Sequence, residues 1–332
     1  MAASTLRPLL PLREAVSSSV QSTFGDDAER FGAFLEPAGD PGWFGPDSIA
    51  WQVHADLGPM LVGGLAALFL QTLHPLVMQG VADNSNYRQD PLGRLRRTAD
   101  FLALTTYGGT GQAAAAVRQV ATLHRSVAGV AADGRPYRAS DPELLTYVHV
   151  TEVWSFLRAF QRYSGRPLLR AEKERYLEET AFVATRLGAR SVPRSVAEVR
   201  RYVREVRPEL RATATALDAA AFLRRRFGRS PLERVAHLVI VEAAVDLLPG
   251  FARKELRLAR PAPYRRMAVR PAAGVLAAGL HLMLGESPLL AASRARTAAE
   301  IDQTGRSPSV RADRSARRSR ASSSSSPGGG SC

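Results

Sequence analysis

The sequence predicts an all-α protein, with a single large helical domain followed by a disordered tail. Helix start and stop signals delimit segments along nearly the whole chain, and strand-like alternation of apolar and polar residues is almost absent. No regular repeat is visible. Hydrophobic residues make up 45% of the 332 residues, which is enough for a sizeable core. Length alone also suits two domains, but the continuous helical pattern favours one.

The first expected helix begins at Asp47, whose side chain can cap it, and runs through Trp51 and His54. Asp90-Pro91 and Asp141-Pro142 are further helix starts, because proline fits the first helical turn. The expected helices after the first cover residues 57–78, 90–106, 112–130, 140–163, 169–187, 194–206, 208–226, 231–247 and 263–284.

The uncharged segment 57–78 has two interpretations. Its 22 residues could span a bilayer. However, it contains prolines, glycines and His74, and no aromatic belt flanks it. A helix that is apolar all round is also found at the centre of large helical proteins. We therefore expect a buried core helix here, which His74-Pro75 ends.

We divide the chain into an N-terminal helical extension (1–37), an all-helical domain (38–304) and a tail (305–332). From Ser307 the sequence is rich in arginine, serine and glycine, a composition that cannot bury a core, so we expect the tail to be disordered. The apolar run at 6–12 is too short and too interrupted by proline for a secretory signal. We therefore expect a cytoplasmic protein and leave a peripheral membrane contact open.

The formal charge of +14 is weak support for nucleic-acid binding. All but two of the 45 basic residues are arginines, a skew typical of a GC-rich genome. Residues 306–320 alone carry six arginines against one acid, and the arginines are not interleaved with aromatic residues. We expect no specific nucleic-acid partner. The single cysteine, Cys332, excludes an internal disulfide framework and any cysteine-based zinc or iron–sulfur site.

The sequence does not support three common kinds of catalytic site. Residues 109–114 match the dinucleotide fingerprint G-x-G-x-x-A, but the preceding segment reads as helix, so a turn between helices is favoured. His149 and Glu152 share a helix face, but a ferritin-like di-iron site needs two E-x-x-H elements and further glutamates. A G-x-S-x-G turn for a serine hydrolase is missing from the sequence.

His124 is the most informative single residue. It lies near an apolar helical stripe made by Val117, Val120, Leu123 and Val127. A histidine on such a stripe is commonly a core residue whose hydrogen bonds are satisfied. A single imidazole in an apolar helical pocket is equally what a haem iron needs as its proximal ligand. The pattern alone leaves both interpretations open.

The region from about 38 to 250 resembles the MpaB-type oxygenases, which share a catalytic domain with the latex-clearing rubber oxygenases. The resemblance is carried by short segments in a consistent order: Gly39-Asp-Pro-Gly42, Trp51, 70–75 (LQTLHP), 90–98 (DPLGRLRRT), 123–129 (LHRSVAG), 137–142 (YRASDP) and 147–149 (YVH). It implies an all-helical fold with a globin-like core and a non-covalent haem b. It also implies O2 as co-substrate and oxidative cleavage of carbon–carbon double bonds in an apolar or isoprenoid-like substrate.

The resemblance also assigns roles by position. His124 is similar to the proximal iron ligand, and Arg94 and Thr98 to a pair lying over the haem pocket. Arg97 matches a position where rubber oxygenases can place a lysine; because an arginine keeps its proton, we expect no ligation of iron by this residue. His74 and His149 match family histidines that line the pocket or support its ligands.

Two departures from the family pattern bear on the substrate. Asn84 precedes Ser85 where many relatives have a histidine, and Ala128 stands where many have an arginine. They leave a second hypothesis open, a non-catalytic helical protein that binds haem or another apolar ligand. A third places the chain on a membrane surface through its arginines and segment 57–78. The sequence leaves the oligomeric state open.

Overall fold

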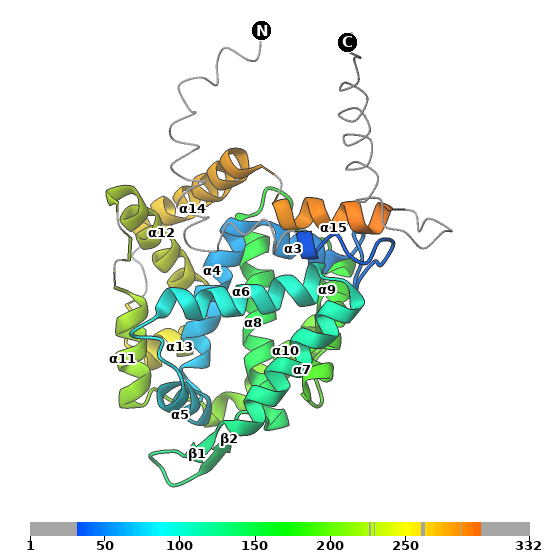
Figure 1. The fold of residues 1–332 in the computed structure, drawn as a ribbon. Coiled ribbons are helices and arrows are strands. Elements are labelled where there is room, and N and C mark those ends of the chain that lie inside the picture. The colour runs from blue at the N-terminus through cyan, green and yellow to red at the C-terminus, as the bar shows by residue number, and fades with distance from the viewer. Residues whose placement is uncertain (1–31, 226, 229, 260–262, 286, 300–332) are drawn as a thin grey trace, which may run out of the picture.

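The computed structural model describes residues 32–299, apart from 226, 229, 260–262 and 286 (Figure 1). Residues 1–31 of the expected extension and the whole expected tail lie outside the described residues. The described helices are α3 (Ile49–Ala55), α4 (Leu57–Gln71), α5 (Pro75–Asn84), α6 (Pro91–Tyr107), α7 (Thr110–Ser126), α8 (Pro142–Tyr163), α9 (Arg170–Leu187), α10 (Val196–Val206), the 3₁₀ helix η2 (Arg207–Glu209), α11 (Ala214–Leu223), α12 (Pro231–Leu247), α13 (Gly250–Glu255), α14 (Pro263–Leu284) and α15 (Pro288–Ala298). The all-α prediction is confirmed.

The structure confirms that the uncharged helix ends before Pro75, and it shows that the apolar segment 57–78 belongs to two helices. Helix α4 ends at Gln71, and Pro75 opens α5. Proline disfavours helical backbone at the residue before it, and His74 accordingly has an extended conformation, with φ of −85° and ψ of 113°. Among the described residues no single helix is long and apolar enough to cross a membrane; α3 and α4 meet that test only together, bent by 91°.

Other boundaries differ more modestly. Ser48, not Asp47, caps α3, because its hydroxyl accepts a hydrogen bond from the Trp51 amide. The helix expected at 112–130 ends at Ser126 and gives way to a short antiparallel hairpin of β1 (Ala128–Val130) and β2 (Pro136–Arg138). The helix expected at 208–226 is reduced to α11, and α13 and α15 were not expected.

The core forms around α4 and α8. Two glycines of α4 allow neighbouring helices to approach closely: a Cβ on Gly63 would lie 2.9 Å from Cα of Phe156 in α8, and one on Gly58 would lie 2.6 Å from Cα of Ala277 in α14. The largest core cluster joins apolar residues of α4, α8, α12 and α14. Helix α4 is therefore a core helix, as expected for this segment.

Arg296 in α15 fixes the chain segment that precedes α3. It is 1% exposed, and its guanidinium donates hydrogen bonds to the carbonyl oxygens of Phe34, Asp40 and Tyr107 at 2.8–2.9 Å. A buried guanidinium is costly unless its donors are satisfied, so these bonds hold α15 against the end of α6.

Candidate functional site

The candidate site is built on the two helices that leave the turn at Gly108 and Gly109. Gly108 ends α6 and Gly109 begins α7, which confirms the turn predicted for the glycine motif. In Figure 1, α6 runs across the molecule, whereas α7 descends from the turn to the β1–β2 hairpin. The predicted residues Arg94 and His124 lie near the free ends of these diverging helices, and neither helix makes an extended backbone contact with α8.

The first turns of α6 carry the three predicted catalytic residues. Arg94 is half-buried and donates a hydrogen bond from Nη1 to the hydroxyl of Ser85 at 2.7 Å. Burial lowers the pKa of its guanidinium, which stays protonated at ordinary pH. Thr98 is exposed and donates to the Arg94 carbonyl oxygen at 3.1 Å, and Arg97 lies on the surface, 3.5 Å from Asp90 Oδ2.

The predicted iron ligand, His124, is half-buried in the last turns of α7. Its Nδ1 is buried without a hydrogen-bond partner. Burial lowers the pKa of the ring, which favours the neutral imidazole. A neutral imidazole is the form that binds a metal.

The other two predicted histidines lie on different elements. His74 is buried before α5, and its ring centre is 5.0 Å from that of Tyr147. His149 lies deep on α8, where burial lowers its pKa to about 4, yet it keeps some accessible surface. The structure thus distributes the three predicted histidines over α7, α8 and the start of α5.

These three histidines share an unusual feature. Within the described part of the chain, six buried side-chain nitrogen or oxygen atoms have no hydrogen-bond partner, and three of them are ring nitrogens of His74, His124 and His149. Buried polar atoms are normally paired, and exceptions call for a ligand, a water or an ion. Each of the three histidines predicted to hold a cofactor thus has one buried ring nitrogen without a hydrogen-bond partner in the described residues; the other three such atoms belong to Trp51, Arg135 and Ser293.

Apolar side chains beside Arg94 and His124 are also unusually open. Leu95 is 37% exposed and Leu123 is 57% exposed, although each is next in sequence to a predicted site residue. The apolar stripe expected on α7 is buried at Val117 and opens toward its end at Leu123. A large, flat, apolar group with polar edges, such as haem, has the chemistry to cover these side chains and to meet the nearby cationic and imidazole groups.

A polar cluster missed by the sequence reasoning lies deeper in the protein. The ring of His54 on α3 is 2.9 Å from Thr106 Oγ1 through Nδ1 and 3.0 Å from the Tyr176 hydroxyl through Nε2. Burial lowers its pKa to about 4. Glu152 on α8 interacts electrostatically with Tyr176, and burial raises the Glu152 pKa to about 7. In the sequence, His54 is only one residue of an expected helix. No local sequence pattern predicts its contacts with α6 and α9, because they join residues that lie far apart in the chain.

The predicted histidines do not belong to an ordinary metal-binding cluster in the described residues. Across the described ranges, no three histidine, cysteine or acidic side chains come together in a way that could hold a metal ion. Haem iron, by contrast, takes most of its ligands from the porphyrin and needs only one or two from the protein. The single ligand predicted here, His124, is compatible with that requirement.

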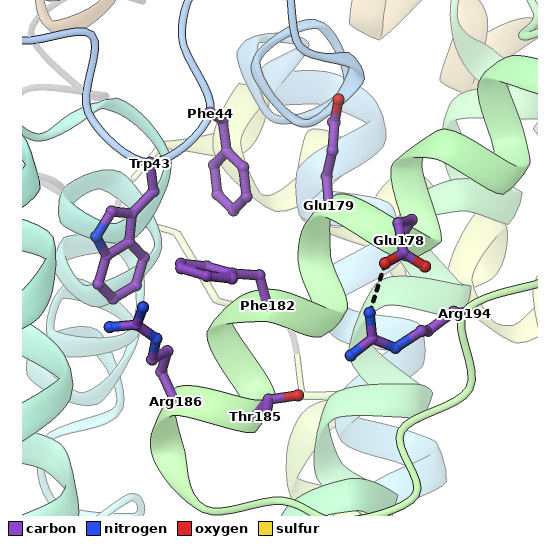
Figure 2. A pocket seen from close by; sticks show the side chains of 8 residues that line it. All are labelled: Trp43, Phe44, Glu178, Glu179, Phe182, Thr185, Arg186 and Arg194. Carbon is purple, nitrogen blue, oxygen red and sulfur yellow. Dashed lines mark hydrogen bonds and ion pairs between the residues drawn. The ribbon is translucent and has the colours of Figure 1, made fainter.

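A pocket of about 360 Å³ lies elsewhere on the surface, between the segment before α3 and helix α9 (Figure 2). The Arg186 guanidinium lies 4.6 Å from the centre of the Phe182 ring, and Trp43 meets the same ring edge-on. Glu178 and Arg194 are paired with each other across the pocket. Its lining consists of Trp43, Phe44, Glu178, Glu179, Phe182, Thr185, Arg186 and Arg194, so it contains none of the predicted site residues.

Comparison with known families identifies the class of protein. Residues 51–278 match the family described as "ER-bound oxygenase mpaB/B'/Rubber oxygenase, catalytic domain". The match spans more than half of the chain, which therefore belongs to this family. No curated protein and no solved structure gives a significant match.

The family match confirms the resemblance inferred from sequence and shifts its limits. It begins at Trp51 and continues into α14, whereas the sequence motifs suggested about 38–250. The chain carries an oxygenase catalytic domain and is of the oxidoreductase type. All of the predicted site residues lie inside the matched region: His74 at the start of α5, and the others on helices α6, α7 and α8.

Proposed function

We propose that this protein is a haem-b-dependent oxygenase that acts on an apolar, unsaturated substrate of isoprenoid type. The observation that carries the proposal is the set of unpartnered buried ring nitrogens on His74, His124 and His149 in a chain of an oxygenase family. Bound haem would supply the iron at which O2 is activated. A cytoplasmic location remains part of the proposal.

His124 would hold the iron. Its burial favours the neutral ring, so ligation does not have to displace a proton. The unpartnered Nδ1 is compatible with two arrangements, in which either this nitrogen or the opposite one faces the metal. His149 and His74 would border the cofactor, because each keeps one buried ring nitrogen free of partners in the described chain.

Arg94 and Thr98 would provide a hydrogen-bond donor and a hydrogen-bond acceptor, respectively, at the open edge of the site. The hydrogen bond to Ser85 leaves the other guanidinium nitrogens of Arg94 available for an anionic group such as a haem propionate. The Thr98 hydroxyl already donates to the Arg94 carbonyl oxygen, so it can act there as an acceptor. Arg97, whose exposed side chain lies near Asp90, would contribute positive charge at the open edge of the site.

The proposed reaction inserts both atoms of O2 across one carbon–carbon double bond. The double bond breaks, two carbonyl groups form, and no external reductant is consumed. The chain itself would contribute apolar side chains, such as Leu95 and Leu123, which contact the substrate and exclude water from it.

Haem-loaded protein incubated with a short polyisoprenoid under ¹⁸O2 tests the activity. We expect two carbonyl products, each carrying one labelled oxygen, and loss of product formation in Arg94→Gln. Haem binding with no oxygen consumption, on apolar substrates of several lengths, would contradict the oxygenase proposal.

One observation favours the alternative, a helical protein that binds haem or another apolar ligand without catalysis. Asn84 stands where many relatives have a histidine, and its amide donates to Tyr137 Oη at 3.2 Å and to the Gly80 carbonyl oxygen. Its side chain is thus engaged in supporting the hairpin. The same incubation separates the two functions, because the alternative predicts a haem spectrum without products.

A further inference from the structure

The exposed face of α14 is apolar over most of its length. The outward positions are Met267, Pro271, Val275, Ala278 and Leu282, which recur at helical spacing on one side. Met267, Val275 and Leu282 are 78%, 72% and 65% exposed. A surface helix normally turns charged or polar residues outward, whereas this apolar face is left uncovered by the residues that the structure describes.

The neighbouring helix α12 also carries exposed apolar side chains. Leu232, Val235 and Leu238 are exposed along its first turns, and α12 packs directly on α14. Together the two helices contain six of the thirteen large apolar side chains that are exposed in the described residues. Figure 1 shows α12 and α14 side by side at one edge of the molecule. We call these six side chains the α12–α14 face.

The basic charge of the chain is concentrated in the same segment. Residues 224–283 contain twelve arginines and lysines but only four acids, a net charge of +8. The segment 306–320 carries +5, which leaves the rest of the chain at +1 in a total of +14. The charge is therefore not spread evenly along the chain but is densest in the sequence segment that contains α12 and α14.

The position of this face is fixed by a buried charge cluster. Asp246 of α12 accepts hydrogen bonds from Arg162 of α8 at 2.9 Å and from Arg270 of α14 at 3.0 Å. The Asp246 side chain is only 4% exposed. The cluster ties α14 to the core helices, so the apolar face is held on a rigid support.

We infer that the α12–α14 face docks on the surface of an anionic lipid bilayer. Apolar side chains on helices that lie in the membrane plane insert at the boundary of headgroups and acyl chains, and nearby arginines bind acidic headgroups. A second copy of the chain fits this surface less well, because pairing the two faces would bring two segments of +8 together. The inference does not depend on the oxygenase proposal.

Flotation with lipid vesicles tests the inference in the full-length chain. We expect binding to vesicles of phosphatidylcholine with phosphatidylserine, weaker binding to phosphatidylcholine alone, and release by high salt. The double variant Val275→Asp with Leu282→Asp should bind about tenfold more weakly, because it places charge in the apolar layer. Both side chains are exposed, so the fold should be retained, as checked by circular dichroism.

Two controls assign the effect to this face. Val130→Asp changes a valine of similar exposure (63%) on the β1 strand and should leave vesicle binding unchanged. Replacing the six arginines of 306–320 by glutamine should reduce binding less than the double variant does. Unchanged binding in the double variant, or binding lost only with the 306–320 arginines, would overturn the inference. A dimer that the double variant abolishes, with no vesicle binding by the unmodified chain, would likewise overturn it and assign the face to self-association.

Discussion

The Arg94 guanidinium is held by the Ser85 hydroxyl, with 2.7 Å between Nη1 and Oγ. Ser85 is the residue at which α5 ends, and Arg94 lies in the first turns of α6. The hydrogen bond therefore spans the loop between these helices and sets the direction of the one half-buried arginine among the predicted site residues. A hydrogen bond to a charged group is stronger than a neutral one, so this contact restricts where the guanidinium can reach.

Ser85→Ala should release Arg94 without unfolding the protein. We expect a loss of about 1 to 3 kcal/mol in the free energy of unfolding, measured with urea. In haem-loaded, reduced protein, the infrared stretch of bound carbon monoxide should shift in Ser85→Ala and in Arg94→Gln. Ser164→Ala, which alters a half-buried serine at the end of α8, serves as the control and should leave the stretch unchanged. A stretch identical in all four proteins would show that Arg94 does not face the cofactor.

The interior pair His54 and Tyr176 supports a prediction on stability. Tyr176→Phe removes the hydroxyl 3.0 Å from His54 Nε2 and leaves that nitrogen unpaired in the core. The expected cost is about 1 to 3 kcal/mol in the free energy of unfolding. Tyr87→Phe removes a phenol whose bond to Arg88 is exposed, and should cost much less. Equal losses in the two variants would mean that the His54 contact adds no specific stability.

Glu152 should make stability depend on pH. Its pKa is about 7 in the folded protein against 4.5 as the reference, because burial disfavours the charged carboxylate. The folded state therefore binds more protons than the unfolded state between these values, and the Glu152 contribution to stability falls as pH rises through this window. Glu152→Gln removes the effect, so its stability relative to the unmodified protein should rise by up to about 3 kcal/mol from pH 4.5 to above pH 7.

Urea unfolding across that pH range measures the difference. Glu143→Gln is the matched control, since Glu143 lies exposed in the first turn of the same helix. A Glu152→Gln curve that stays parallel to that of the unmodified protein would show that the carboxylate is solvated.

The Asp246 cluster predicts how firmly α14 is attached. Asp246→Asn leaves Arg162 and Arg270 without their shared carboxylate. The carboxylate is buried but the two arginine side chains are 31% and 40% exposed, so we expect a loss of about 1 to 3 kcal/mol in the free energy of unfolding. Thermal unfolding should show this loss. Asp218→Asn breaks an ion pair with Arg88 in which both side chains are largely exposed, and should cost less than about 1 kcal/mol. Protection of α14 amides from hydrogen exchange should fall in Asp246→Asn alone.

The sequence was most informative where helix boundaries have local causes. Asp90-Pro91 and Asp141-Pro142 each begin a helix as expected, because the capping carboxylate and the proline act within one turn. The helix end expected at His74-Pro75 also has a local cause, because the proline ends the helical backbone although the apolar composition continues across it. The β1–β2 hairpin is only three residues a strand, too short for alternation to be visible.

The residues of the candidate site also differ in how far the sequence could indicate them. His124 was marked by its place on an apolar stripe, and its role as a ligand, like the roles of Arg94 and Thr98, came from the family resemblance. The contacts of His54 with Thr106 and Tyr176 join residues 52 and 122 positions apart, so only the packing of α3 against α6 and α9 creates them. The clustering of charge in 224–283 was present in the sequence, but its meaning depends on the exposure of α12 and α14.

The most direct test of the account is a titration of haem into the purified protein, followed by absorption in the Soret region. We expect a saturable Soret band in the unmodified protein and in His237→Ala, whose ring lies on α12 and bonds to the Arg225 carbonyl oxygen. His124→Ala should remain helical but lose the band or show a weakened one that added imidazole restores. A protein that stays colourless after haem addition, or a His124→Ala spectrum identical to that of the unmodified protein, would contradict the assignment of His124 as the iron ligand.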